Sequence, residues 1–594
     1  MKTRIGRLLC GMIAGLFLPL GAAAAVLVPE AERLAPPTQA RVDALLDAVE
    51  SDGFEGVEHA VRDAAFAAAA ARKTRAMEGW LVLARWFRLL PETEGAATKR
   101  WVLAINAAGL GHANMAREWD LPAVPLSRRL KPDTVRVLLG HAEFSRTFFE
   151  QLTPYDHLPQ VLGVLDELVT ADANAFRQYH QLALAIALVS DMTPPPDWPH
   201  RQVSQEVLPR KLPSPVQSFA FWVASDRQRR TLHRLTQLPA GELKFLVSTA
   251  ATYPELQWAR QHARHTLAEL PSAYTSIEYR MDRVEMNRMN WPGKDYRLPV
   301  IRQQGGICVD QAYYACEVGK AHGVPTLLFN GAGRDGRHAW FGYLDAGQRW
   351  RMDVGRYAEQ RYVVGVATDP QTWGDVTDHE LAFLTERFRL LPSYRQSRAH
   401  YLLAGELLKL GRIDEAVTVA RQAVNHERRY VDAWDLLMEA IEAQGADAKT
   451  REATLREAAR AVRRYPDLNA RFMRQVIATL RERGQESAAA HEERLLTQKF
   501  SGNRVDLAAT QAAEILLRSV AVDAPLAQMR AFERGLQQLG PDAGMLMFDR
   551  LVRPFVRHLR ETGRTADAKQ AIVIARRVLA VQPGTQLDRE LARL

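Results

Sequence analysis

The sequence predicts a multidomain, mainly α-helical protein in which one α+β domain lies between two helical regions. Its 594 residues are too many for one hydrophobic core. Apolar residues recur at three- and four-residue intervals on both sides of the centre, as in amphipathic helices. Between them, residues 273–362 hold short runs of aromatic and β-branched residues separated by glycines, which favours strands. We expect an α-helical region over residues 26–264, an α+β domain over 265–390 and further helices over 391–594.

The first residues have the order of a cleaved secretory signal. MKTRIGRLLCGMIAGLFLPLGAAAAVLVPE starts with basic residues, continues with an apolar stretch and ends in small residues from Gly21 to Ala25. An uncleaved anchor is the alternative, because Leu8 to Ala25 approaches the ~18 residues of a spanning helix. Pro19 and the alanines favour cleavage. We therefore place a signal peptide at residues 1–25 and expect a periplasmic or secreted protein without stable membrane insertion.

The charge of the chain is basic but diffuse. Removing the signal, which carries three basic and no acidic residues, lowers the formal net charge from +9 to +6. No arginine-rich block and no aromatic RNA-binding signature accompanies this charge. We therefore expect no nucleic-acid partner.

The region before the central domain carries no recognisable chemistry. Proline-rich breaks at residues 193–199 (TPPPDWP) and 211–215 (KLPSP) divide its helical pattern into blocks. His262 and His265 lie one helical turn apart, a spacing that suits a metal on one helix face. No third ligand is close in the sequence, so we expect surface histidines and no metal site.

The chain after the central domain repeats itself, with small residues where two antiparallel helices would approach closely. A spacing of 34 residues is typical of two-helix repeats. This spacing relates His400, Leu403, Leu407 and Gly411 to Trp434, Leu437, Ile441 and Gly445. Weaker copies follow around Gly484 and Gly563. The pattern resembles tetratricopeptide repeats, a resemblance that implies a concave surface for a protein partner. A plain helical cap over the central domain is the alternative.

Cys308 and Cys316 remain after the signal, in a predicted helix (CVDQAYYACEVGKAHG) that should end at Gly323. On one helix their Cα atoms lie ~12 Å apart, too far for a disulfide. Cys308 falls in the first turn, where amide N–H groups and the helix dipole favour a thiolate. The glycines before it would let a substrate carbonyl approach closely. Cys316 lies among small residues, and we expect it to be a buried packing residue.

Two strands downstream supply a histidine and a carboxylate. VPTLLF (residues 324–329) predicts a strand followed by a glycine-rich loop, and HAWFGYL and QRWRMDV predict two strands joined by a turn. With a turn of two to four residues, His338 faces a position between Asp353 and Gly355. Cross-strand neighbours of this kind lie within reach of each other.

These residue types meet the demands of acyl transfer. Cys308 would attack a carbonyl, His338 would take and return a proton, and Asp353 would orient the imidazole. Gln303 or Gln304 would assist a main-chain N–H in binding the oxyanion; the sequence does not decide between them. Taken singly, the three residues also fit structural roles as a packing cysteine, a core histidine and a turn-capping acid.

At these residues the sequence resembles the transglutaminase-like superfamily. GGICVDQAYYACEVGKAHGVPTLLFNG, RHAWFGYL and RWRMD look like its three blocks: a cysteine at a helix start, a histidine before an aromatic residue on a strand, and an aspartate on the next strand. The resemblance implies a papain-like core with Cys308 as nucleophile, His338 as base and Asp353 as orienting acid. It covers only the residues around these blocks.

The resemblance leaves the reaction open, because the superfamily includes cross-linking enzymes, peptidases, amidases and inactive binding proteins. The leading hypothesis is an exported cysteine enzyme that acts on amide bonds of proteins or peptides through a thioester, with an amine or water as acceptor. The alternative is an inactive envelope scaffold that binds peptides or proteins through its repeats. No cofactor or metal is expected, since no acidic loop matches a calcium-binding pattern.

Overall fold

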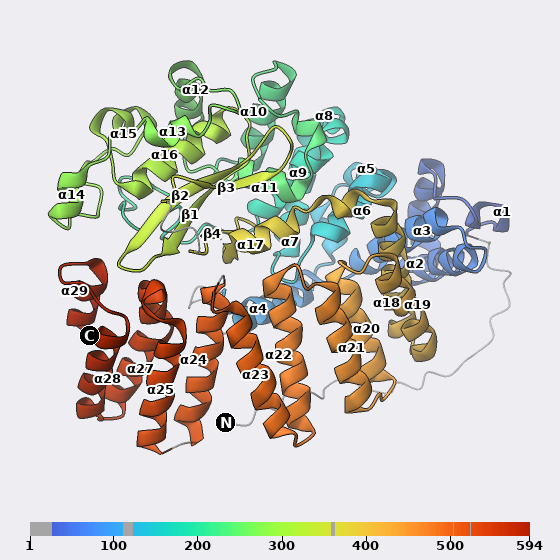
Figure 1. The fold of residues 1–594 in the computed structure, drawn as a ribbon. Helices are drawn as coiled ribbons and strands as arrows, with labels where there is room; N and C mark the ends of the chain where they lie inside the picture. The colour runs from blue at the N-terminus through green and yellow to red at the C-terminus, as the bar shows by residue number, and fades with distance from the viewer. Residues whose placement is uncertain (1–26, 111–122, 358–362, 503, 523) are drawn as a thin grey trace.

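The structure of the protein is a computed structural model that describes residues 27–110, 123–357, 363–502, 504–522 and 524–594. The predicted signal peptide lies outside the described residues. The described chain is mainly helical and holds one five-stranded sheet near its middle (Figure 1), which confirms the mainly α class. None of its helices combines the length and the apolar character that crossing a bilayer requires.

The first region is an array of helices, in which α9 is almost wholly buried among α6, α7, α8, α10 and α11. Residues 193–199 and 211–214 lie between α9 and α10, and Pro215 begins α10, so the proline-rich segments separate helices as predicted. A positive φ of 69° at Gly53 bends α2. The helices are α1 (Glu30–Arg33), α2 (Gln39–Ala70), α3 (Thr74–Leu89), α4 (Glu94–Ala108), α5 (Pro132–Gly140), α6 (Ala142–Gln151), α7 (Leu158–Ala171), α8 (Ala173–Gln178), α9 (His180–Val189), α10 (Pro215–Arg227), α11 (Ala240–Val247) and α12 (Tyr253–His262).

The central region builds an antiparallel sheet in the order β3-β2-β1-β4-β5. Helix α16 packs along β1 and β2. Alternate residues of β2 therefore face two cores: Phe341 joins the large core shared with α16, whereas Trp340 faces a smaller core on the other side. The elements are α13 (Ser272–Thr275), α14 (Met281–Glu285), α15 (Leu298–Gln304), α16 (Cys308–Ala321), β1 (Thr326–Ala332), β2 (Arg337–Leu344), β3 (Trp350–Val354), β4 (Val366–Thr368), β5 (Asp375–Thr377) and α17 (Asp378–Leu384).

The last region is a row of antiparallel helix pairs (Figure 1). Each neighbouring pair from α18 to α25 is in contact. The helices are α18 (Pro392–Lys409), α19 (Ile413–His426), α20 (Val431–Ala443), α21 (Ala448–Ala461), α22 (Pro466–Glu482), α23 (Glu486–Phe500), α24 (Val505–Val522), α25 (Pro525–Leu539), α26 (Gly544–Met547), α27 (Arg553–Glu561), α28 (Thr565–Val578) and α29 (Gln586–Arg593).

Four loops in this row share one conformation. Gly411, Gly445, Gly484 and Gly563 all have positive φ and follow the ends of α18, α20, α22 and α27. The residue after each glycine donates its main-chain N–H to a carbonyl five residues back: Arg412 to Leu407, Ala446 to Ile441, Gln485 to Leu480 and Arg564 to Leu559. This is the Schellman ending of a helix, in which glycine avoids backbone strain. The glycines aligned in the sequence thus play the same structural part.

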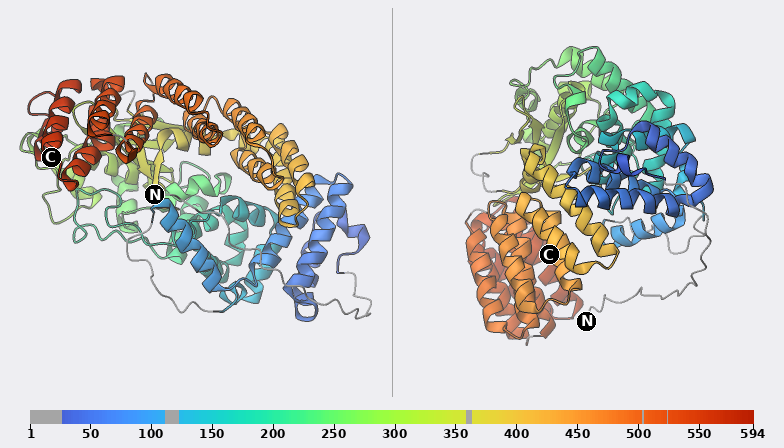
Figure 2. Two further views of the ribbon diagram at one scale, coloured as in Figure 1. Left: turned by 90° about the horizontal axis from the view of Figure 1, so that it is seen from below. Right: turned by 90° about the vertical axis from the view of Figure 1, so that its right-hand side faces the viewer.

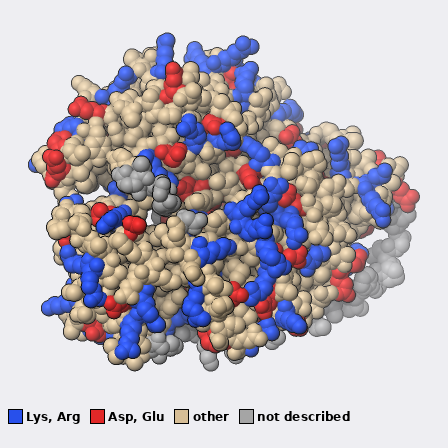
Figure 3. All heavy atoms as spheres, viewed as in Figure 1, with Lys and Arg blue, Asp and Glu red and all other residues tan. Residues whose placement is uncertain are grey.

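The row contacts the rest of the molecule at both ends (Figure 2). At its start, α18 packs against α3, and Arg88 bridges Glu406 at 2.7 Å and Glu58 at 2.5 Å. At its far end, α26 packs against β1. The face in Figure 3 carries many Lys and Arg side chains with Asp and Glu among them. Ion pairs also join alternate helices of the row; one example is Arg421 of α19 with Glu457 of α21 at 2.8 Å.

Candidate active site

Helix α16 begins at Cys308, as the sequence predicted. The carboxylate of Asp310 accepts the main-chain N–H of Ile307 at 2.8 Å and so caps the first turn. The helix ends at Ala321 and is followed by Gly323, whose φ is 72°. The cysteine thus stands on the first turn of a helix whose start is held by a side chain of that helix.

The two glycines before Cys308 serve packing within the protein. Gly305 has a φ of 71°, and a Cβ there would lie 2.6 Å from the carbonyl oxygen of Glu278. At Gly306 an added Cβ would lie 2.3 Å from the Cβ of Asp310. Contacts within the protein therefore already require glycine at both positions; the approach of a substrate carbonyl to this backbone stays a prediction.

The Cys308 side chain is half-buried against strand β2. The main-chain amide of Ala339, the residue after His338, is close enough to lower the pKa of this thiol. The carbonyl of Ala339 accepts the hydroxyl of Tyr274 at 2.9 Å. Burial raises the pKa of the Cys308 thiol above its ordinary value, and the main-chain amides of Ala339 and Val309 act in the opposite direction. The helix start does not by itself produce a thiolate here.

A buried polar network holds the start of α16. Asp310 is fully buried and accepts from Arg283 at 2.8 Å and from the Tyr296 hydroxyl at 2.8 Å. Because that hydroxyl donates to Asp310, it accepts in turn from the Nε2–H of His200 at 2.8 Å. Burial and the charge of Arg210 lower the pKa of His200 to about 3. The sequence correctly placed Asp310 as a helix-start charge, but nothing in it pointed to His200.

His338 lies buried at the start of β2 with its ring oriented by the main chain. Its Nε2 lies 2.7 Å from the carbonyl oxygen of Gly355, and its ring stacks on that of Tyr357 with centroids 4.1 Å apart. A carbonyl only accepts, so Nε2 carries the proton and Nδ1 is the basic nitrogen of the neutral ring. A protein carbonyl thus selects the tautomer that general-base chemistry at Nδ1 needs.

Asp353 lies on β3, as predicted, and its side chain is exposed. Five residues, Asp345 to Arg349, separate the paired Leu344 and Trp350, and a register shift follows. The main-chain N–H of Asp345 donates to the carbonyl of Arg349 at 2.9 Å, so the turn itself is residues 346–348, within the predicted two to four residues. With Phe341 opposite Val354, the same register continued places His338 opposite Tyr357, beyond the end of β3. The orienting role of Asp353 stays a prediction.

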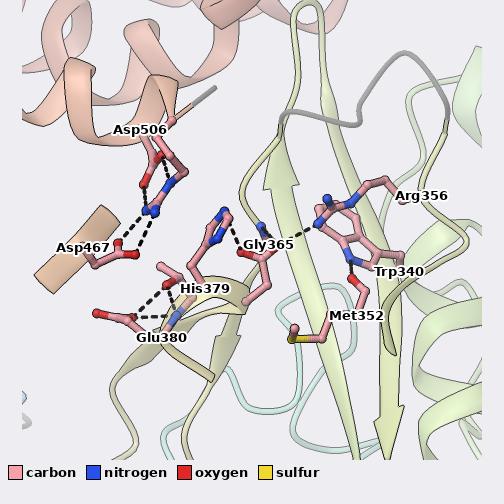
Figure 4. A network of polar contacts seen from close by, with 11 residues as sticks. Trp340, Met352, Arg356, Gly365, His379, Glu380, Asp467 and Asp506 are labelled. Carbon is pink, nitrogen blue, oxygen red and sulfur yellow. Dashed lines mark hydrogen bonds and ion pairs between the residues drawn. The ribbon is translucent and has the colours of Figure 1, made fainter. Parts of the chain in front are cut away.

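The segment after β3 is anchored by a buried ion pair (Figure 4). Arg356 donates to the carboxylate of Asp378 at 2.8 Å and lies over the ring of Trp340 at 4.4 Å. The same Asp378 oxygen accepts the main-chain N–H of Gly365 at 3.1 Å. These contacts hold the residue next to Gly355, and therefore the carbonyl that accepts from His338. In the sequence, Asp378 showed only the pattern of a helix start.

Gln303 and Gln304 form the exposed last turn of α15, directly before the glycines. The carbonyl of Gln304 accepts from Arg280 at 3.0 Å. An oxyanion role for either amide stays a prediction. Cys316 lies two turns into α16, buried and unpaired with Cys308, as expected from their separation on one helix. Burial raises its pKa as well.

The predicted surface histidines make local contacts. His262 Nδ1 lies 2.9 Å from the carbonyl of Trp258, and His265 Nδ1 lies 3.3 Å from the Ser272 hydroxyl. Among the described residues no three His, Cys, Asp or Glu side chains gather as metal ligands would.

Fold and site together define a mainly helical protein in which a helix-start cysteine packs against a histidine-bearing strand. No protein-family model matches the sequence. A search of curated proteins likewise finds no match.

Proposed function

We propose that the protein is an exported, transglutaminase-like cysteine enzyme that acts on amide bonds of proteins or peptides through a thioester. One observation carries the proposal: Cys308 contacts the main chain next to His338, whose Nε2–H is committed to the Gly355 carbonyl. This arrangement supports a thiol as nucleophile and Nδ1 as base.

In the proposed reaction, Cys308 Sγ attacks the amide carbonyl and its proton passes to His338 Nδ1. The carbon–nitrogen bond breaks, and His338 returns the proton to the leaving amine. An amine or water then attacks the thioester, and the sulfur takes the proton back. Because burial raises the thiol pKa, proton transfer must accompany attack; a preformed thiolate is not required. Asp353, and Gln303 or Gln304, stay in the roles proposed from the sequence.

The acyl-enzyme is the intermediate to test for. Wild-type protein is mixed with a peptide digest, quenched in acid and analysed by intact mass and peptide mapping. We expect an adduct on Cys308 that hydroxylamine releases, as it releases thioesters, and no adduct in Cys308→Ala. A hydroxylamine-resistant adduct, or one on another residue, would contradict the proposed chemistry.

The alternative, an inactive envelope scaffold that works through its helical row, is favoured by two observations. The raised thiol pKa and the filled space around Gly305 and Gly306 also suit a cysteine that only packs. Under this alternative, Cys308→Ala changes stability at most.

A further inference from the structure

The tip of the β1–β2 hairpin, residues 333–336, is bound by the far end of the helical row (Figure 1). The main-chain N–H of Met545 donates to the carbonyl of Gly333 at 3.1 Å, and that of Leu587 donates to the carbonyl of Asp335 at 3.1 Å. At Gly544 a Cβ would lie 2.1 Å from the carbonyl oxygen of Arg334. Helices α26 and α29 therefore meet the hairpin backbone to backbone, and at Gly544 of α26 the approach leaves no room for a Cβ.

Arg337, the first residue of β2, adds ion pairs to this contact. Its guanidinium donates to Asp549 at 2.7 and 2.8 Å and to Glu590 at 2.5 Å. Its main-chain N–H donates to the side-chain oxygen of Gln586 at 2.9 Å. Arg553 binds the same two carboxylates, at 3.2 Å and 2.7 Å. Two arginines and two acids thus form one network between the strand and the last helices, and such networks constrain geometry more than isolated surface pairs do.

The residue after Arg337 is His338, and β2 pairs with β1 through both residues. A displacement of the hairpin would therefore move the imidazole relative to Cys308, which α16 carries. A misplacement of ~1 Å in a catalytic group is enough to cost about a hundredfold in rate.

We propose that the C-terminal helices are a structural part of the site: Arg337, Asp549 and Glu590 are positioning residues that hold His338 where it can accept the Cys308 proton. The inference rests on the proposed function. It assigns to the last helices of the row the role of positioning a residue of the same chain.

The test measures alkylation of Cys308 by iodoacetamide against pH in the full chain, with peptide mapping to separate Cys308 from Cys316. One variant, Arg337→Gln, removes the positive charge of the network at the strand. The double variant Asp549→Asn, Glu590→Gln removes both negative charges, and Arg337→Lys keeps the positive charge. Arg421→Gln breaks an ion pair elsewhere in the row and serves as matched control. If Arg337→Gln fails to fold, Glu590→Gln alone, which leaves Asp549 in place, carries the test.

We expect Arg337→Gln to lower the neutral-pH rate at least about tenfold and to shift the pH profile toward that of His338→Ala. Arg337→Lys should recover part of the rate, and Arg421→Gln should stay within about twofold of wild type. The inference is overturned if His338→Ala is slow while Arg337→Gln and the Asp549→Asn, Glu590→Gln double variant keep the wild-type rate and pH profile. If His338→Ala itself matches wild type, the proposed function fails first.

Discussion

The imidazole of His338 donates its Nε2–H to the main-chain carbonyl of Gly355 across 2.7 Å. Gly355 has a φ of 94°, and a Cβ there would lie 2.6 Å from the ring of Tyr274. The orientation of the proposed base therefore depends on a position that only glycine can occupy. The nearest acidic residue on β3, Asp353, is exposed.

Gly355→Ala should damage the site more than its backbone strain alone explains. The left-handed conformation costs about 1–2 kcal/mol in a residue with a Cβ, and the Tyr274 contact adds to this cost. We expect a lower urea midpoint together with a loss of His338-dependent alkylation of Cys308. Gly563→Ala is the matched control, since Gly563 has a φ of 76° with open space for a Cβ. Equal alkylation in both variants would show that the Gly355 carbonyl does not orient His338.

The two carboxylates near the histidine should differ in importance. Asp378 is buried and binds Arg356 and the Gly365 N–H, whereas Asp353 is exposed. Asp378→Asn is expected to slow Cys308 alkylation at neutral pH several-fold more than Asp353→Asn. Rates measured for both variants beside wild type decide the matter. The reverse order would restore Asp353 as the main orienting acid.

Acid should destabilise the protein through His200. Its folded pKa is lowered to about 3, from an ordinary value of 6.5, because it is buried beside Arg210. The unfolded chain then binds a proton that the folded chain does not, so stability is full above pH 6.5 and falls below it. From pH 7 to pH 5 this group alone should remove about 2 kcal/mol of unfolding free energy. Urea unfolding of wild type and His200→Gln at both pH values measures the difference; parallel losses in the two would contradict this assignment.

The buried Asp310 network should contribute far more to the free energy of unfolding than an exposed surface ion pair does. Asp310→Asn leaves the buried guanidinium of Arg283 without its counter-charge, which costs about 3 kcal/mol or more. Asp282→Asn removes one partner of the exposed Arg280 pair and should change the free energy of unfolding far less, because solvent screens that pair. Urea unfolding monitored by far-ultraviolet circular dichroism compares the two. A small effect at Asp310 would mean that the carbonyl groups around Arg283 suffice to hold it.

Local patterns in the sequence predicted the central elements that carry the candidate site. The helix start at Cys308, its end before Gly323, and the strands holding His338 and Asp353 all follow from periodicity and glycine placement. The glycine spacing of the C-terminal helices likewise predicted matching loops at Gly411 and Gly445. These features depend on residues close together in the chain.

What the sequence missed depends on contacts between distant residues. A register shift between β2 and β3 decides what His338 faces, and nothing in QRWRMDV indicates it. The thiol pKa depends on burial by segments far from Cys308. The docking of Gly544 on Arg334 joins residues from different regions of the chain. Nothing in GGIC indicates that Gly305 makes room for the carbonyl oxygen of Glu278.

The central claim is that His338 activates Cys308, and the most direct test is the rate of Cys308 alkylation by iodoacetamide at pH 7 in wild type, His338→Ala and His338→Gln. The account predicts a wild-type rate at least about tenfold above both variants. In the variants the rate should follow the thiolate fraction of the thiol alone, which stays small at pH 7 and keeps rising through alkaline pH because burial raises the thiol pKa. Equal rates in all three proteins at pH 7 would contradict the claim and leave Cys308 as a packing residue.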